Sequence, residues 1–188
     1  MTVTKSLGTS LALVPLVLAC WSTLAHAAEP ADTTFRDYVD TEGNITLPMD
    51  ARQSWVHLGS WVVNDAEAPG AGFHDVYTQP EAAQAYRESG EFADGTVLIK
   101  EIRNIESGTK TTGPALWAGD TQIWFVMVKD TQSRFDSPHW ANGWGWALIK
   151  PDNPMLNVSE SFEQTCQGCH IPAQETDWVF VEGYPTLK

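Results

Sequence analysis

The five residues from Cys166 to His170, Cys-Gln-Gly-Cys-His, constrain this chain more than any other part of its sequence. On a helix, the spacing places two thiols about one turn apart, with an imidazole directly after the second. This pattern is typical of c-type haem attachment, in which the thiols add to two vinyl groups and the histidine ligates the iron. We therefore predict one covalently bound haem c, held by Cys166 and Cys169, with His170 as the metal ligand.

A Cys-x-x-Cys pair has three other uses: a thioredoxin-like dithiol, half of a zinc site and a structural disulfide. A thioredoxin-like motif lies early in a chain, where a strand leads into a helix. A zinc site needs four ligands, and so a second Cys/His pair at suitable spacing. The third cysteine, Cys20, lies in a segment that we expect to be removed. We therefore favour haem attachment over these alternatives.

Residues 1–27 have the features of a secretory signal peptide. Lys5 precedes an apolar run over residues 11–20, and Ala25-His26-Ala27 supplies small residues for cleavage. We expect a mature haem domain over residues 28–188, exported to the periplasm. A lipoprotein signal ending at Cys20 is the alternative, and it would leave the protein anchored to a membrane.

Composition limits the partners that the protein can have. The chain has 188 residues and a formal net charge of −13 at pH 7, and the mature part is long enough for one domain with a hydrophobic core. A surface this acidic disfavours nucleic acid and anionic membranes, and it suits a basic soluble redox partner. The same acidity could instead serve only to keep an exported protein soluble.

Apolar and alternating segments predict a sheet-rich fold. Strands are expected over residues 55–63, 73–78, 96–105, 121–129, 144–150 and 178–181. Helices are expected just after Asp50, over 81–89 between Pro80 and Gly90, and from Val158 into the haem motif, with turns over 107–113 and 151–154. We infer a single α+β domain, mainly antiparallel sheet with a few helices.

The expected strand over residues 96–105 carries a lysine on an apolar face. Alternation places Lys100 on the same face as Leu98 and Ile102. From spacing alone, a lysine at the edge of the sheet whose ammonium group reaches water would account for this position.

The place of the haem motif excludes the arrangement found in small helical electron-carrying cytochromes c. In those proteins an axial methionine lies far downstream of the motif, whereas only eighteen residues follow His170. A sixth ligand must therefore come from upstream, and Met127 and Met155 are the candidates. Because Met127 lies in an apolar segment typical of a core and Met155 in an expected turn, we expect an open sixth position.

Several segments beyond the haem motif form a specific combination. They include Trp55-Val56-His57-Leu58-Gly59, Gly90-Glu91-Phe92-Ala93-Asp94-Gly95-Thr96-Val97-Leu98-Ile99-Lys100-Glu101, Phe125-Val126-Met127-Val128-Lys129-Asp130, Trp144-Gly145-Trp146-Ala147 and, behind the motif, Asp177 and Tyr184-Pro185. In this combination the chain resembles the cytochrome P-460 family over nearly all of its mature length.

The resemblance implies a dimeric, sheet-rich, exported monohaem protein. Enzymes of this family oxidise hydroxylamine, can act on nitric oxide, and pass electrons to a soluble cytochrome. Their haem carries a third covalent link, from a lysine nitrogen to a meso carbon, and Lys100 occupies the position of that lysine in the motif. Burial would favour the neutral amine that such a link requires. We therefore expect a P-460-type haem if Lys100 is cross-linked.

The chain departs from the family pattern at the expected distal positions. Three residues before Tyr77, where the resemblance implies an arginine, stands His74, which could bond a nitrogen ligand or relay protons, or could be a histidine at a strand edge. Nine residues before His170, where it implies a carboxylate, stands Ser161, and Glu163 and Asp75 are the substitutes that lie near the two departures in sequence. His74, Ser161 and Glu163 are thus the candidate catalytic residues.

The favoured hypothesis is a haem enzyme that oxidises hydroxylamine at an open iron, with a soluble cytochrome c as electron acceptor. The alternative is a protein that binds or sequesters nitric oxide, like the sheet-type cytochromes c prime, which lack the lysine link and line the distal face with aromatic residues. Phe73, Trp124 and Phe125 keep that alternative open. A simple electron carrier with two axial ligands ranks last.

Overall fold

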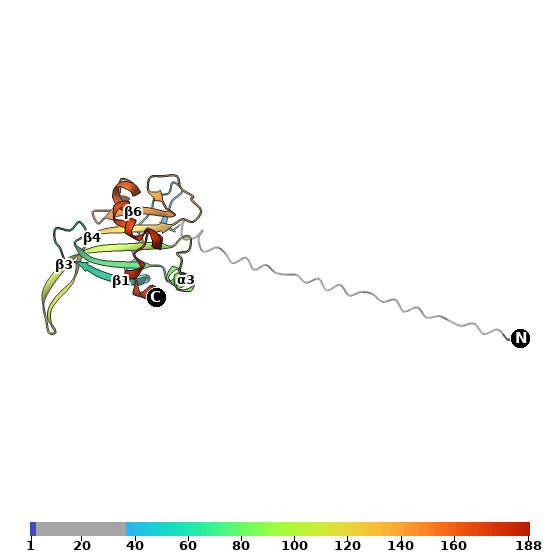
Figure 1. Ribbon diagram of the computed structural model, residues 1–188, viewed down its shortest axis with the longest axis horizontal. Coiled ribbons are helices and arrows are strands. Elements are labelled where there is room, and N and C mark those ends of the chain that lie inside the picture. Colours follow the sequence, from blue (N-terminus) through green and yellow to red (C-terminus); the bar gives the residue numbers. More distant parts are fainter. Residues whose placement is uncertain (3–36) are drawn as a thin grey trace.

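The computed structural model describes residues 1–2 and 37–188, and residues 37–188 form the folded body in Figure 1. Apart from its first two residues, the expected signal peptide lies outside the described residues, as do Cys20 and the expected start of the mature domain. In the part of the chain that the structure describes, no helix is long and apolar enough to cross a membrane.

One antiparallel sheet forms the body of the molecule and confirms the predicted α+β class. Its seven strands are β1 (Val56–Val63), β2 (Gly72–Thr78), β3 (Val97–Lys110), β4 (Gly113–Lys129), β5 (Trp140–Ala141), β6 (Trp144–Lys150) and β7 (Asn153–Asn157). Their order is β1-β2-β3-β4-β6-β5, and β7 also pairs with β6. Short turns join β3 to β4 and β6 to β7, and these strands pair with each other, whereas β4 pairs with β6 across the sheet.

Helices α2 and α3 lie before and between the strands. The short helix α2 (Ala51–Ser54) follows Asp50, as predicted. Helix α3 (Pro80–Ser89) begins at Pro80, whose fixed φ suits the first turn. It ends where Gly90 adopts a φ of 77° and donates its N–H to the Tyr86 carbonyl, a left-handed cap that glycine makes without a Cβ clash.

The C-terminal part of the chain is a series of short helical turns. They are a π-helical turn η1 (Phe162–Cys166), the helix α4 (Gln167–His170), and the 3-10 turns η2 (Ile171–Thr176), η3 (Val181–Gly183) and η4 (Pro185–Leu187). Ser161 begins η1, because its Oγ accepts the N–H of Gln164 at 3.1 Å. The predicted helix leading into the haem motif therefore exists, although its first turn is π-helical.

The predicted turn over residues 107–113 is wrong. Strands β3 and β4 stay paired as far as Lys110 and Gly113, and Figure 1 shows their ribbon projecting beyond the body of the sheet. This stretch is largely polar because both faces of the ribbon are exposed, so it lacks the alternation that marks a strand against a core.

Two other expectations near the C-terminus are corrected. The predicted turn over residues 151–154 is shorter, because β7 begins at Asn153 and pairs with β6. The predicted strand over 178–181 does not form: Trp178 has a φ of 65°, outside the extended region, and its N–H bonds to the carbonyl of Ala173 at 2.8 Å. A short apolar run cannot distinguish a strand from a buried turn.

The sheet carries a different apolar cluster on each face, because successive side chains of a strand point to opposite sides. One cluster joins strand residues to the C-terminal turns and includes Leu58, Val76, Leu98, Trp146, Phe162, Trp178 and Tyr184. The other joins strand residues to the segment before β1 and includes Val39, Ile45, Leu47, Tyr77, Ile99, Val126 and Ile149. The C-terminal segment passes so close to β1 that a Cβ on Gly59 would overlap the Gly183 carbonyl oxygen.

Candidate functional site: a haem cavity between the sheet and the C-terminal turns

A cavity of about 370 Å³ lies between the sheet and the C-terminal turns. The sheet contributes His74, Val76, Leu98, Lys100, Ile102, Phe125, Met127, Trp146 and Leu148. The turns contribute Thr165, Cys166, Cys169, His170, Phe180 and Tyr184. The haem motif thus shares one cavity with Lys100 and His74, residues that lie far from it in sequence.

Strand register explains why Lys100 lies in the middle of this wall. Val76, Lys100, Phe125 and Leu148 are successive partners across β2, β3, β4 and β6, so they form one row on the cavity side. The Lys100 Nζ lies 4.5 Å from the centre of the Phe125 ring, and burial lowers the pKa of its amine. Because β3 is an internal strand, the edge-lysine interpretation is wrong.

The proximal histidine is held by one short hydrogen bond. The Nδ1 of His170 lies 2.7 Å from the backbone oxygen of Trp178. Since a carbonyl only accepts, Nδ1 carries the hydrogen and donates it, which leaves Nε2 free to ligate a metal. Burial lowers the pKa of the imidazole, and this favours the neutral form that a ligand must have.

The two thiols stand at one end of the same cavity. Cys166 is buried at the end of η1, and burial raises the pKa of its thiol to about 11, whereas Cys169 is exposed on α4. Neither sulfur is in a disulfide. Two free thiols, an imidazole with Nε2 available and an apolar wall together fit a covalently attached haem, with His170 as the proximal ligand.

His74 lines the cavity and carries an unpaired ring nitrogen. Its side chain is buried and lies against Trp61, with ring centres 5.0 Å apart. Nε2 donates to the Gly70 carbonyl at 2.7 Å, so Nδ1 bears a lone pair, and within the described residues that atom has no hydrogen-bond partner. The lone pair of Nδ1 is therefore not engaged by any hydrogen-bond donor in the described part of the chain. The pKa of His74 is lowered, mainly because the side chain is buried.

A family model described as Cytochrome P460 matches residues 49–181, well over half of the chain, and this range includes every cavity-lining residue except Tyr184. The chain belongs to the cytochrome P460 family. Membership supports a covalently bound haem c and the oxidoreductase-type haem chemistry of the family. No curated protein matches this cytochrome P460 chain.

Not every predicted site residue meets in the P460 cavity. His74, Lys100, Cys166, Cys169 and His170 all line it. The lining does not include Ser161, which begins η1, or Glu163, which is exposed on that turn. A catalytic role for these last two stays a prediction.

The candidate axial methionines are placed differently. Met127 is buried and lines the cavity, whereas Met155 lies on β7 with 77% of its surface exposed. Sequence reasoning missed Trp146, whose ring lies edge-on to His170 with centres 4.8 Å apart, and Tyr184. Both residues lie in segments that carry the family resemblance, Trp-Gly-Trp-Ala and Tyr-Pro. Neither segment contains a residue type that by itself indicates contact with haem.

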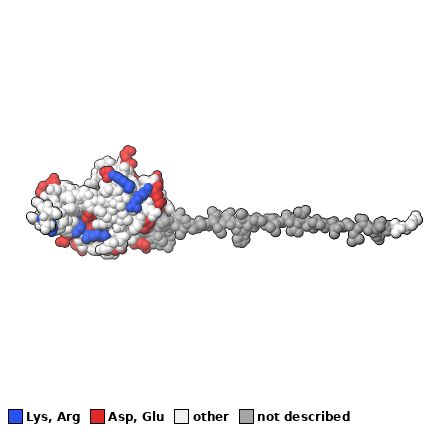
Figure 2. Space-filling model, turned by 90° about the horizontal axis from the view of Figure 1, so that it is seen from below, with Lys and Arg blue, Asp and Glu red and all other residues white. Residues whose placement is uncertain are grey.

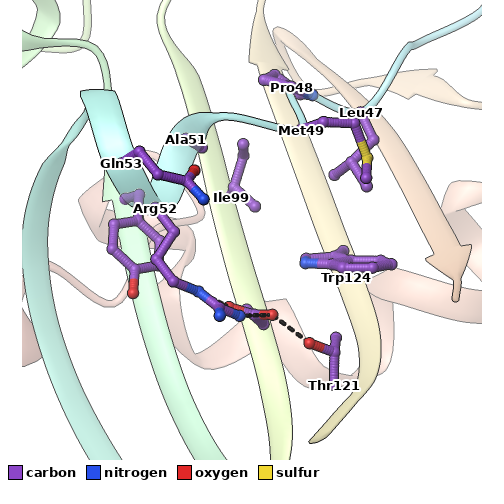
Figure 3. A pocket seen from close by; sticks show the side chains of 11 residues that line it. Leu47, Pro48, Met49, Ala51, Arg52, Gln53, Ile99, Thr121 and Trp124 are labelled. Carbon is purple, nitrogen blue, oxygen red and sulfur yellow. Dashed lines mark hydrogen bonds and ion pairs between the residues drawn. The ribbon is translucent and has the colours of Figure 1, made fainter.

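Of the three aromatic residues that kept the gas-binding alternative open, only Phe125 lines the haem cavity. Trp124 lies on the opposite face of the sheet, in a second pocket of about 250 Å³ beside α2 (Figure 3). There Arg52 pairs with the buried carboxylate of Glu101, which also accepts the Thr121 hydroxyl. This pocket is separate from the P460 haem cavity, because Lys100 and Glu101 point to opposite faces.

Proposed function

We propose that this cytochrome P460 protein is an exported enzyme that oxidises hydroxylamine, and that it can also act on nitric oxide. The observation that carries the proposal is the unpaired Nδ1 of buried His74 in the wall of the cavity that also holds His170. A group that can accept protons beside a redox centre suits a substrate that loses both protons and electrons.

The chain's own residues would prepare the reaction. Bound haem would supply redox-active iron that can bind and oxidise a small nitrogen compound. His170 would hold the metal through Nε2 while Nδ1 stays bonded to Trp178. Oxidation of hydroxylamine to nitric oxide releases three electrons and three protons, and Nδ1 of His74 would accept protons. Leu98, Ile102 and Phe125 would keep the site apolar.

We further propose that Lys100 forms a third covalent bond to the haem. Its amine lies in the cavity wall, and burial favours the neutral form that can attack. Replacing a meso C–H by C–N releases two protons and two electrons, and the soluble acceptor would take the electrons. The product would be a P-460-type haem.

We propose a soluble cytochrome c as the electron acceptor, in the periplasm, and a homodimer as the working form. A net charge of −13 would steer a basic partner. Figure 2 shows one face on which acidic side chains gather toward the rim, with basic ones nearer the middle. For the homodimer, the support is the projecting β3–β4 ribbon, which exposes Leu116 and Trp117.

Hydroxylamine-dependent reduction of a soluble cytochrome c tests the proposal. In haem-loaded protein, His74→Gln keeps a donor for the Gly70 carbonyl and removes the basic nitrogen. We expect it to lower kcat/KM about 100-fold. His57→Gln, at an exposed histidine of β1 outside the cavity, is the matched control and should keep wild-type activity. Equal activity of both variants would contradict a role for His74.

Nitric oxide binding is the second candidate function, and the aromatic and aliphatic lining of the cavity favours it. Intact mass and peptide mapping separate the two candidates. A haem-linked Lys100 peptide in wild type, absent from Lys100→Leu, would support the oxidase. A free Lys100, with nitric oxide binding and no hydroxylamine turnover, would assign the protein to gas binding.

A further inference from the structure

The carbonyl that bonds the proximal histidine belongs to an unusual turn. Trp178 and the preceding Asp177 both have left-handed backbones, with φ of 65° and 56°. Side chains with a Cβ rarely adopt this conformation, and two in succession persist only when surrounding contacts enforce them. The backbone oxygen of Trp178 therefore points at His170 because something holds the turn.

Two groups from the sheet hold Asp177. The Nζ of Lys129, at the end of β4, lies 2.8 Å from each carboxylate oxygen. The indole N–H of Trp144, on β6, donates to the Asp177 backbone oxygen at 3.0 Å. Lys129 also lies over the Trp144 ring, 4.9 Å from its centre. These contacts clamp the turn to the sheet one residue before the carbonyl that His170 uses.

We propose that Lys129 and Asp177 are positioning residues for the proximal histidine. Their ion pair fixes the turn that presents the Trp178 carbonyl to Nδ1 of His170 and thereby helps to set the reduction potential of the haem. The side chain of Asp177 is 39% exposed, and a pair this open adds little stability by itself. Its geometric effect on the ligand is the larger consequence. The inference rests on haem attachment and not on the proposed substrate.

The direction of the effect follows from the hydrogen bond. An Nδ1–H that donates to a well-placed carbonyl makes the imidazole a more basic ligand, which strengthens the iron–histidine bond and favours ferric iron. Loosening the turn should weaken the bond, so the potential rises. A purely electrostatic effect behaves differently: loss of the Asp177 charge raises the potential, whereas loss of the Lys129 charge lowers it.

The test uses haem-loaded Lys129→Met and Asp177→Asn, with reduction potential and the ferrous iron–histidine Raman stretch as readouts. We expect both variants to favour ferrous iron at least threefold, a rise of about 30 mV for one electron, with the stretch moving to lower frequency. Lys129→Arg should restore wild-type values. Potentials that move in opposite directions, or an unchanged Raman band, would overturn the proposal.

Two further variants complete the design. Asp94→Asn breaks the ion pair with Arg134 and makes the same change of charge as Asp177→Asn. Among the described residues, no hydrogen bond or ion pair joins Asp94 to residues 177–178. We expect Asp94→Asn to leave the frequency of the iron–histidine Raman band unchanged. Trp144→Phe removes the indole N–H that bonds the Asp177 backbone oxygen, without changing charge. If the ion-pair variants do not hold haem, the Raman band of this variant tests whether the contacts at Asp177 position His170. A wild-type Raman band in Trp144→Phe would then reject the clamp.

Discussion

Lys100 and Glu101 are neighbours in sequence with opposite surroundings. Lys100 lies in an apolar wall with an aromatic ring beside its amine, and Glu101 lies on the other face, paired with Arg52 and Thr121. A buried charge is costly unless it is paired. Within the described residues, Glu101 has its ionic partner, whereas no ionic partner is seen for Lys100. Covalent attachment to haem would remove that cost at Lys100.

His74 should make stability depend on pH. Burial lowers the pKa of its folded form below the ordinary value of about 6.5, so the unfolded chain binds more protons just below that pH. The free energy of unfolding should therefore fall as pH drops below about 6.5 toward the folded pKa. Urea unfolding around pH 7.5 and pH 5 should show a smaller loss for His74→Gln than for wild type.

His57→Gln again provides the control, because that histidine is exposed. Both histidine variants lose one imidazole, and they differ in whether that imidazole is buried. If His74→Gln lost as much stability on acidification as wild type, burial of His74 would not be the source of the pH dependence.

At the scale of the elements, the sequence predicts best where a strand borders the core. Alternation located β1, β2 and β6 within a residue or two, and it placed Lys100 on the face of Leu98 and Ile102. It failed in the outer β3–β4 ribbon, whose strands are paired but whose side chains are mostly exposed on both faces. The haem motif likewise revealed His170 but not Trp178, because that contact depends on a left-handed turn that no local pattern predicts.

Alanine substitutions at Gly90, which ends α3, and at Gly168, in the haem motif, should change the free energy of unfolding in opposite directions. Gly90 has a φ of 77° and nothing within 4 Å of a built Cβ, so only backbone strain opposes the change. Gly90→Ala should lower the free energy of unfolding by about 1 kcal/mol. Gly168 lies in α4 with equally open space. Gly168→Ala should raise stability by about 0.5 kcal/mol.

Denaturant unfolding of the two variants checks this pair. Because neither added methyl group meets a neighbour, their difference reports backbone conformation alone. A destabilising Gly168→Ala would mean that the added methyl meets the attached haem, and a neutral Gly90→Ala would mean that another cap replaces the glycine.

At the scale of the whole molecule, the last residues complete the core on the haem side. Leu187 is 5% exposed and belongs to the same cluster as Val76 and Phe162. Deletion of Leu187 and Lys188 should lower the free energy of unfolding by about 2–3 kcal/mol. Deletion of the exposed Lys188 alone should change it by less than about 0.5 kcal/mol.

Tryptophan fluorescence during urea unfolding of the two truncated proteins measures this difference. The single deletion controls for moving the terminal carboxylate. Equal stability of the two truncations would show that η4 contributes nothing to the core, despite the hydrogen bond from Arg87 to the Thr186 carbonyl.

In sequence, the haem motif follows all the strands of the described sheet, so it is synthesised after them. A ribosome therefore completes Lys100 and His74 before it makes either thiol that carries the haem. If thioether bonds tether the ring beside the paired strands, its edge would meet Lys100 at the high effective concentration of an intramolecular reaction. Formation of the bond between Lys100 and haem would then be the last step of maturation, and it would take place after the sheet has folded.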